Sequence, residues 1–500
     1  MGNEQDISNN FSETNDHRII IVGTGFSGVG AAIKLKQQGI HSFIILERAG
    51  EIGGTWRDNT YPGAACDVQS HLYSFSFEKN PNWSRTFSPQ QEIQDYMLHC
   101  VEKYQLRKHI RLNTPINRAT FAENTGRWTL QSAHGEHFTA QVLVTACGAL
   151  SNPALPSIKG IDTFAGKIMH TAQWDHDYPL ENKRIGVIGT GASAIQVVPA
   201  IAPLIKNLTV FQRTAPWVVP KADKPYRQGT KNMLGRVPFI QKLYRGYIYL
   251  LNEVRAPLII FDTFLSKLLE KEGLRNINHY ISDPILKKKV TPEFKVGCKR
   301  ILLTNDWYST LSKSNVDLVT DPILEINKSG VVTKEGTEYP FDVIIAATGF
   351  DVPTAAAPFE IIGLNGASLN EQWRDGAEAH RGTTVSGFPN LFIMMGPNTG
   401  SGSTSMVYYI ESQIHYILQG IQLILDKNLK YVDVIQECQD TFNARIERKM
   451  KKMVWSSGCK SWYQASNGKI TTLWPGFSWQ FRLATRRFDQ KEYHKVMGQR

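Results

Sequence analysis

The chain has 500 residues, of which 42% are hydrophobic and 20% charged, and its net charge is +11 at pH 7. This length is too great for one hydrophobic core, so we expect two or three domains with room for a large cofactor. The composition is that of an ordinary soluble globular protein. The basic residues are scattered and form no nucleic-acid-binding motif, so no nucleic-acid partner is expected.

The cysteines and the N-terminal segment give information on location and metal binding. The six cysteines show no CxxC pair and no zinc-ligand spacing with histidine, so we expect free thiols in a reducing cytosol and no metal site. Residues 1–16 are polar and acidic, lack the apolar core of a signal peptide, and are interpreted as a disordered tail. No apolar run of about twenty residues is present, so no spanning helix is expected, and the predicted location is cytoplasmic.

Residues 18–48, RIIIVGTGFSGVGAAIKLKQQGIHSFIILER, form a predicted strand–helix–strand unit around a GxGxxG motif. In this motif Gly23 permits the tight turn, Gly25 lets the backbone approach a pyrophosphate, and Gly28 lets the helix pack against the strand. The start of the helix offers free N–H groups to phosphates. Glu47 ends the second strand, where its carboxylate can accept hydrogen bonds from a ribose diol.

The same design recurs at residues 182–202, where the turn carries the GxGxxA version of the motif. The next strand does not end in an acid but in Arg213 and Thr214. A carboxylate would repel a 2′-phosphate, whereas a guanidinium and a hydroxyl can bind it, so this site favours NADP over NAD. Two dinucleotide folds with different strand ends predict FAD in the first and NADPH in the second. The residues assigned to the second site are Thr190, Gly191, Ala192, Ser193, Ala194, Gln196, Arg213 and Thr214.

Two further apolar strands, within residues 140–150 and 339–351, end in small residues that let the chain cross between two nucleotide-binding units. The predicted fold class is therefore α/β, with two Rossmann-like domains, a discontinuous FAD domain, an NADP domain inserted into it, and a helical insert. The expected boundaries are 1–16 for the tail, 17–150 and 341–500 for the FAD-binding domain, 151–220 and 296–340 for the NADP-binding domain, and 221–295 for a helical insert that caps the active site.

Residues 239–270 are rich in apolar side chains that Lys, Arg and Glu interrupt at helical spacing. A packed pair of amphipathic helices is the simpler interpretation, and contact with a membrane surface stays open as an alternative. Nothing in the sequence indicates the oligomeric state.

A spaced marker, F-x-G-x-x-x-H-x-x-x-W-D, lies between the two dinucleotide folds and is called the fingerprint below. It consists of Phe164, Gly166, His170, Trp174 and Asp175. With this fingerprint the chain resembles the class B flavoprotein monooxygenases, specifically the type I Baeyer–Villiger monooxygenases, over nearly its whole length. The resemblance implies that FAD, NADPH and O₂ convert ketones to esters or lactones through a C4a-peroxyflavin. It also implies a conformational role for the fingerprint, as a hinge that lets NADPH shift.

The resemblance assigns roles to single residues. Within GCKR, Arg300 is expected to stabilise the peroxyflavin and its adduct with the ketone, while Lys299 helps to hold the 2′-phosphate. Asp67 matches an acid that orients this arginine, so Arg300 and Asp67 are the expected catalytic residues. The expected FAD contacts are Gly23, Gly25, Ser27, Gly28, Glu47, Thr55, Trp56, Asp67, Tyr73, Ile116 and Met406.

Three other function classes make different demands on the sequence. A class B monooxygenase that mainly oxygenates sulfur or nitrogen is the alternative that stays open. A flavin disulfide reductase would need a CxxC-like pair near the flavin, which the sequence lacks. A nucleotide-sensing or membrane-binding scaffold would show no NADPH turnover.

Overall fold

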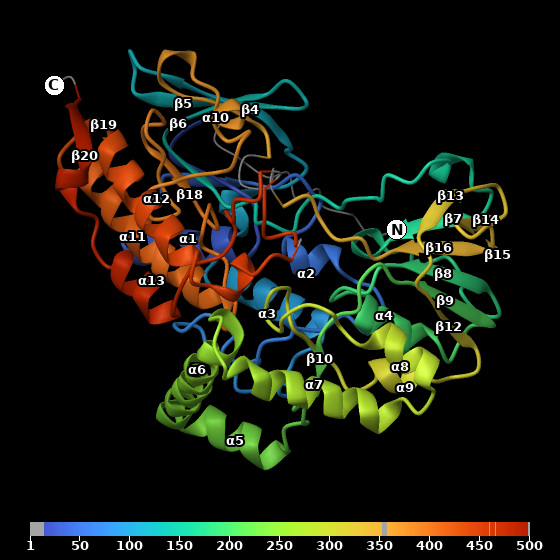
Figure 1. Ribbon diagram of the computed structural model, residues 1–500. Helices are drawn as coiled ribbons and strands as arrows, with labels where there is room; N and C mark the ends of the chain where they lie inside the picture. The colour runs from blue at the N-terminus through green and yellow to red at the C-terminus, as the bar shows by residue number, and fades with distance from the viewer. Residues whose placement is uncertain (1–14, 353–357, 460, 466, 499–500) are drawn as a thin grey trace, which may run out of the picture.

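The computed structural model describes residues 15–352, 358–459, 461–465 and 467–498 (Figure 1). The chain forms two lobes, each built on a sheet, and a layer of helices that lies below both in this view. The first lobe contains β1 (Asp16–Val22), and the second contains β8 (Arg184–Ile188). Most of the expected tail, residues 1–14, lies outside the described residues, and Asp16 already begins β1.

The first lobe is built on an eight-stranded sheet with the order β17-β4-β5-β6-β1-β2-β3, and β18 also pairs with β6. Strands β1, β2, β3 and β6 are parallel neighbours, as expected for a dinucleotide-binding unit. The strands are β2 (Phe43–Leu46), β3 (Ile110–Arg111), β4 (Ile116–Ala122), β5 (Arg127–Ser132), β6 (His137–Thr145), β17 (Glu360–Ile362) and β18 (Leu391–Ile393).

Two helices cover one face of this sheet. Helix α1 (Phe26–Gln37) follows the first glycine turn, and α11 (Met406–Asp426) packs directly against it. The contact is close because Gly30 has no side chain: an added Cβ would lie 2.9 Å from Ile414 Cδ1. Helix α11 brings the C-terminal part of the chain beside the first glycine turn.

The second lobe is built on a parallel sheet with the order β12-β9-β8-β16-β7. Its branched apolar residues are buried on both faces, which is typical of parallel strands. The strands are β7 (Lys167–His170), β9 (Asn207–Phe211), β12 (Val316–Val319) and β16 (Val343–Ala346). The predicted α/β class with two Rossmann-like sheets is confirmed.

The remaining elements connect or cover these sheets. Helices α5 (Gln228–Arg236), α6 (Pro238–Ile260), α7 (Ser266–Tyr280) and α8 (Pro284–Val290) come from the expected helical insert. The others are α2 (Thr55–Asp58), α3 (Gln90–Lys103), α4 (Ala194–Ile201), α9 (Trp307–Leu311), α10 (Leu369–Gln372), α12 (Gln436–Met450), α13 (Ser478–Ala484), β10 (Val218–Val219), β11 (Leu302–Leu303), β13 (Ile323–Ile326), β14 (Gly330–Thr333), β15 (Glu338–Pro340), β19 (Leu429–Val434) and β20 (Tyr493–Met497).

One expected boundary differs from the sheet pairing. The sequence-based division at residue 340 assigns β16 to the first unit, whereas β16 pairs with β7 and β8 in the second lobe. The four residues of β16 are buried between these two neighbours. The second lobe therefore extends at least to Ala346.

The two connections between the lobes run side by side. Strand β7 begins the second lobe and β16 ends it, and they pair in register, with His170 opposite Ala346. Beyond these strands, Ala154 N–H donates to the Gly349 carbonyl at 3.0 Å, and Thr348 Oγ1 donates to the Ala154 carbonyl at 2.6 Å. The entering and leaving segments are thus joined to one another by hydrogen bonds.

A disulfide joins Cys298, immediately before Lys299 and Arg300, to Cys459 in the C-terminal segment. The two cysteines are 161 residues apart, and their Cα atoms are 6.2 Å apart. The expectation that all thiols are free is therefore wrong for this pair. No local spacing rule could find two half-cystines so far apart in sequence. The free cysteines are Cys66, Cys100, Cys147 and Cys438.

Alkylation of the denatured protein should test this bond. Without reductant, four of the six cysteines should react with iodoacetamide, and after reduction all six should react. Replacement of both Cys298 and Cys459 by serine should lower the free energy of unfolding by about 2–4 kcal/mol, because the cross-link restricts the unfolded chain. Six reactive thiols in the unreduced protein would contradict the assignment.

Candidate functional site

The first glycine turn forms an open cradle at the start of α1. Gly23 has φ +108°, and a Cβ on Gly28 would lie only 1.9 Å from the Gly23 carbonyl oxygen, so the turn and the packed helix both require glycine. At Gly25, which caps α1 without any side-chain hydrogen bond, an added Cβ would meet nothing within 4 Å. The N–H groups at this helix start therefore face open space, as a phosphate-binding turn requires.

Glu47 lies beside this turn, and both of its carboxylate oxygens have partners in the protein. Thr24 donates to Glu47 Oε2 from its backbone N–H at 2.9 Å and from its hydroxyl at 2.6 Å. Arg57 Nη1 lies 3.0 Å from Glu47 Oε1. Although burial acts against its charge, hydrogen bonds to Asp58 and the charge of Glu47 raise the pKa of Arg57. Arg57 joins the glycine turn to the loop that follows β2.

The loop after β2 places three of the expected flavin-side residues next to the turn. A Cβ on Gly54 would lie 3.2 Å from Gly25 Cα, so this loop rests directly on the cradle. Thr55 begins α2, and Trp56 Nε1 donates to Tyr73 OH at 3.0 Å. The Trp56 and Tyr73 rings meet edge to face at 5.6 Å. The aromatic side chains of Trp56 and Tyr73 therefore lie next to the first glycine turn.

The other expected FAD residues are distributed around this lobe. Ser27 is buried in the first turn of α1. Met406 begins α11, and its Sδ accepts from Ser401 N–H at 3.0 Å. Ile116 begins β4 and packs against a different hydrophobic cluster from the one that contains α1.

The second glycine turn repeats the open geometry. Gly189 has φ +117°, and an added Cβ there would lie 2.4 Å from the Ala347 carbonyl oxygen. At Gly191 an added Cβ would meet nothing within 4 Å. Thr190 Oγ1 donates to the Thr214 carbonyl at 3.2 Å, which ties this turn to the end of β9. The structure thus brings residues 190–194 and 213–214 together.

Gln196, one of the residues expected to contact NADP, joins the two lobes by hydrogen bonds. Its Oε1 accepts from Tyr61 OH at 2.8 Å and from Ala65 N–H at 3.3 Å, and its Nε2 donates to the Ala65 carbonyl at 3.0 Å. The backbone approaches equally closely, since a Cβ on Gly63 would lie 2.7 Å from the Gln196 carbonyl oxygen. The loop beside the first cradle is therefore held against α4 of the second lobe.

Two cations gather near the second turn. Burial and then repulsion by Arg213 lower the pKa of Lys299. Lys299 Nζ also lies 4.8 Å from the centroid of the Phe294 ring. No acid is among the causes of the Lys299 pKa shift, so this pair presents positive charge that an anion would relieve.

Arg300 and Asp67 form an ion pair that joins the segment after the insert to the loop of the first lobe. Arg300 Nε and Nη2 both donate to Asp67 Oδ2, at 3.0 and 2.6 Å. The attraction of Asp67 raises the pKa of Arg300. Burial acts to raise the pKa of Asp67, yet the charge and hydrogen bonds of Arg300 hold it below its ordinary value. The Arg300 side chain is still 42% exposed, so it can meet a ligand as well as Asp67.

Sequence reasoning missed two side chains at this pair. Lys221 is a second cation whose charge acts on Asp67, and burial lowers its pKa. Tyr463 is buried beside Arg300, and burial raises its pKa to about 12 although the Arg300 charge opposes the rise. Tyr463 stands in the aromatic WYQ stretch of the C-terminal segment, and this stretch could have pointed to it in the sequence. Nothing in the sequence marks Lys221.

The fingerprint residues lie on β7 and its flanks, where the chain enters the second lobe. Gly166 is required, because an added Cβ would lie 2.6 Å from the Asp342 carbonyl oxygen and from the Phe164 ring. His170 is buried, its Nδ1 accepts from Ala172 N–H at 3.0 Å, and burial lowers its pKa. Its ring meets Phe350 edge to face at 5.9 Å, so it contacts the leaving connection.

The last two fingerprint residues complete this edge of the second lobe. Asp175 forms an ion pair with Lys167 of β7 at 2.6 Å. Trp174 packs, half-buried, against the core of the second lobe. The structure thus gathers the fingerprint at the connection between the lobes.

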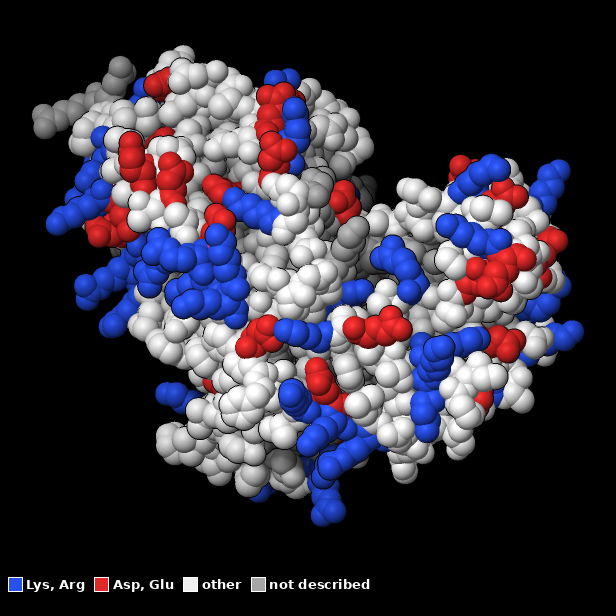
Figure 2. All heavy atoms as spheres, in the orientation of Figure 1, with Lys and Arg blue, Asp and Glu red and all other residues white. Residues whose placement is uncertain are grey.

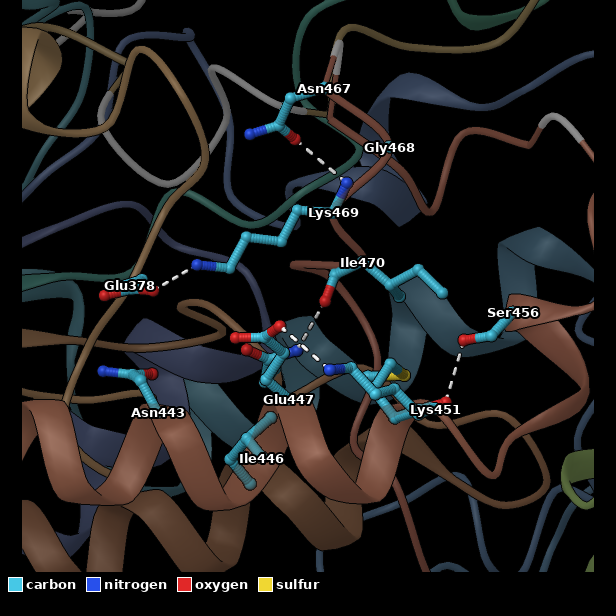
Figure 3. A pocket seen from close by; sticks show the side chains of 12 residues that line it. Glu378, Asn443, Ile446, Glu447, Lys451, Ser456, Asn467, Gly468, Lys469 and Ile470 are labelled. Carbon is cyan, nitrogen blue, oxygen red and sulfur yellow. Dashed lines mark hydrogen bonds and ion pairs between the residues drawn. The ribbon is translucent and has the colours of Figure 1, made fainter.

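A separate polar cavity of about 500 Å³ lies between α12 and the C-terminal segment (Figure 3). Lys469 spans it and pairs with Glu378, while Glu447 and Lys451 lie along α12. None of the expected site residues is among those that line it, so it is distinct from the Arg300–Asp67 site. Among the described residues, no group of three or more His, Cys, Asp or Glu side chains could hold a metal ion.

Comparison with known proteins identifies the family. A family model described as pyridine nucleotide-disulphide oxidoreductase matches residues 20–236, which contain both glycine turns. A Baeyer–Villiger monooxygenase of Pseudomonas aeruginosa is 46% identical over 479 residues, covering 95% of this chain and 91% of the relative. The chain belongs to the Baeyer–Villiger monooxygenases. The resemblance stated from the fingerprint is therefore confirmed, and this protein is an enzyme of the monooxygenase class.

Solved structures share nearly the whole fold of this chain. Cyclohexanone monooxygenase from Rhodococcus sp. Phi1, bound to NADP⁺, has a TM-score of 0.88 at 27% identity, with 97% of this chain and 100% of that chain covered. A complex of OTEMO with FAD and NADP has a TM-score of 0.87 at 25% identity, with 96% and 99% covered. In the described part of this chain, no helix is both long and apolar enough to cross a membrane.

The Arg300–Asp67 pair should make stability depend on pH. Because the folded pKa of Asp67 lies below its ordinary value of about 3.9, the pair contributes fully above that pH and is lost as the pH falls through the folded pKa. A double-mutant cycle with Asp67→Asn and Arg300→Ala, followed by urea unfolding at a series of pH values, should give a coupling free energy that is constant above about pH 4 and decreases as the pH is lowered further. A coupling free energy that does not change with pH would contradict this account.

Proposed function

We propose that the chain binds FAD at the first glycine turn and NADPH at the second, and uses O₂ to insert one oxygen atom beside the carbonyl of a ketone, giving an ester or lactone. The observation that carries this proposal is the Arg300–Asp67 pair, in which a part-exposed guanidinium joins the loop of the first lobe to the segment that carries Lys299. The family and the solved relatives that contain FAD and NADP support it.

The residues of the first lobe fit FAD. The pyrophosphate would lie on the uncapped start of α1, where Gly25 leaves open space, and Glu47 would accept from the ribose hydroxyls. Thr55, Trp56 and Tyr73 would lie on the ring side, since their loop rests on the same turn. When bound, the flavin would supply the reduced ring that activates O₂.

The residues of the second lobe fit NADPH rather than NADH. Gly191 leaves space for the pyrophosphate, and Arg213 with Lys299 would hold the 2′-phosphate, whose charge would relieve the repulsion between them. Thr214 follows Arg213 at the end of β9 and can add a hydroxyl donor.

In the proposed reaction, Arg300 stabilises negative charge that develops on oxygen during attack at the carbonyl. Asp67 acts through Arg300: it accepts two N–H bonds and thereby fixes the plane of the guanidinium. The buried Tyr463 and Cys66 lie on the protein side of the pair. The fingerprint serves as the hinge that lets the second lobe reposition the nicotinamide.

Replacement of Arg300 tests the reaction directly. The purified, FAD-loaded Arg300→Ala variant should lose ester formation from ketones by at least about a hundredfold, because the developing charge loses its partner. Reduction of the flavin by NADPH, followed by stopped-flow absorbance, should remain measurable. Products are to be measured with linear, cyclic and aryl ketones and with an aryl sulfide.

A matched control is Lys295→Ala, which removes an exposed cation of the same segment that pairs with Asp262. It should keep ester formation. Ester formation at the parent rate by Arg300→Ala would refute the role of Arg300. If the parent enzyme oxidises the sulfide but forms no ester from any ketone, the proposed ketone reaction would be wrong, and heteroatom oxygenation would be the function instead.

Replacement of the two cations of the second lobe tests the coenzyme assignment. Arg213→Ala and Lys299→Ala should each raise the KM for NADPH about tenfold or more, with little change in the KM for NADH, because only NADPH carries the 2′-phosphate. Lys206→Ala, at an exposed cation of the same lobe, is the control and should change neither. An equal loss for both coenzymes would contradict a 2′-phosphate site.

A further inference from the structure

Helix α6 exposes apolar residues on its outer side and buries polar as well as apolar residues on its inner side. The inner face buries Gln241, Asn252 and Glu253 together with Ile248, Ala256 and Ile260. Its outer face exposes large apolar side chains at helical spacing, which we call the α6 stripe. The stripe consists of Phe239 (65% exposed), Leu243 (56%), Tyr247 (60%), Leu250 (60%) and Val254 (67%).

The α6 stripe is continuous and long. Its members are spaced by three or four residues over sixteen positions, so they occupy one side of the helix for roughly 22 Å. The neighbouring helices also expose apolar side chains, with Met233 of α5 45% exposed and Leu268 of α7 57% exposed. Apolar surface of this extent on one element marks an interaction site rather than scattered exposed residues.

The inner face explains why the stripe cannot be turned inward. Asn252 Nδ2 donates to Gln69 Oε1 at 3.2 Å, and Glu253 Oε1 accepts from Ser478 Oγ at 2.5 Å. Arg245 donates to the carbonyl of His71 at 2.7 Å. These polar contacts hold the orientation of the helix, so the apolar side faces outward in the folded protein.

The exposed charges on α5 and α6 are of one sign. Residues 228–260 contain five cations and one acid, and that acid, Glu253, is buried on the inner face. On α6, Lys242 and Arg255 are the exposed charged residues and flank the stripe. The surface over α6 and α5 in Figure 2 is largely free of acidic groups, with basic groups at its margin. The cations of this segment are Lys231, Arg236, Lys242, Arg245 and Arg255.

From this combination we infer that the α6 stripe docks on an anionic lipid bilayer surface, with the helix lying in the plane of the interface. The apolar side chains would enter the acyl boundary, and Lys242 and Arg255 would meet lipid phosphates. A second copy of this chain fits less well, because packing the stripe on itself would bring Lys242 and Arg255 against the same cations of the other copy, and α5 and α6 carry no exposed acid to neutralise them. This inference goes beyond the proposed oxygenation and does not depend on it.

Vesicle co-sedimentation of the full-length, FAD-loaded protein tests the inference. The protein should bind vesicles that contain phosphatidylglycerol and bind pure phosphatidylcholine vesicles much more weakly. The Leu243→Ser, Leu250→Ser double variant should bind the anionic vesicles about tenfold or more weakly. Leu155→Ser with Leu204→Ser, at leucines that are 55% and 53% exposed elsewhere, is the control and should bind as the parent does.

A charge-reversed variant, Lys242→Glu with Arg255→Glu, separates the two parts of the inference. It should lose the preference for phosphatidylglycerol, and far-UV circular dichroism should show that it and the leucine variant remain folded. Absence of vesicle binding by the parent, or equal binding by the leucine variant, would overturn the inference. A dimer in sedimentation velocity that the leucine variant abolishes, without vesicle binding, would overturn it in favour of a second copy. Unchanged binding after charge reversal would overturn the assignment to anionic lipid.

Discussion

The ion pair between Arg300 and Asp67 is the contact on which the arrangement of the site depends. It joins residues 233 positions apart, one from the segment after the helical insert and one from the loop that rests on the first glycine turn. Each partner is anchored a second time. The disulfide of Cys298 fixes the arginine segment to the C-terminal segment, and Gln196 fixes the loop to α4. The two glycine turns, which belong to separate sheets, are thereby held in fixed positions relative to the guanidinium of Arg300.

The distribution of positive charge explains a large part of the remaining chemistry. The chain carries a net charge of +11, and whereas Arg300 is paired with Asp67, Arg213, Lys299, Lys242 and Arg255 form no ion pair with an acid in the described part of the chain. Arg213 repels Lys299 at the second turn, and Lys242 and Arg255 flank the α6 stripe. Uncompensated positive charge lowers the stability of the free protein, and binding of an anion restores that stability. The same physical principle therefore applies to a coenzyme phosphate and to a lipid phosphate.

Local patterns predicted the parts of the fold that local physics determines. The spacing of Gly23, Gly25 and Gly28 predicts the turn because close backbone contacts there exclude a side chain, and the second turn follows the same rule. Features formed by distant residues were not predictable from one sequence. The Cys298–Cys459 bond, the contact of Lys221 with the Asp67 charge and the pairing of β16 in the second sheet arise only when remote segments meet. The amphipathic pattern of α6 was visible, but which side faces outward depends on the partners of Asn252 and Glu253.

The paired connections between the lobes restrict how the molecule can rearrange. Because Ala154 is joined to Thr348 and Gly349 by hydrogen bonds and the His170 ring meets Phe350, the entering and leaving segments lie against each other where the chain passes between the lobes. These two segments therefore have to move together when the second lobe moves. The Gln196 bonds to Tyr61 and Ala65 are a third link, so any reorientation of the second lobe has to break these bonds or carry the Tyr61 loop with it.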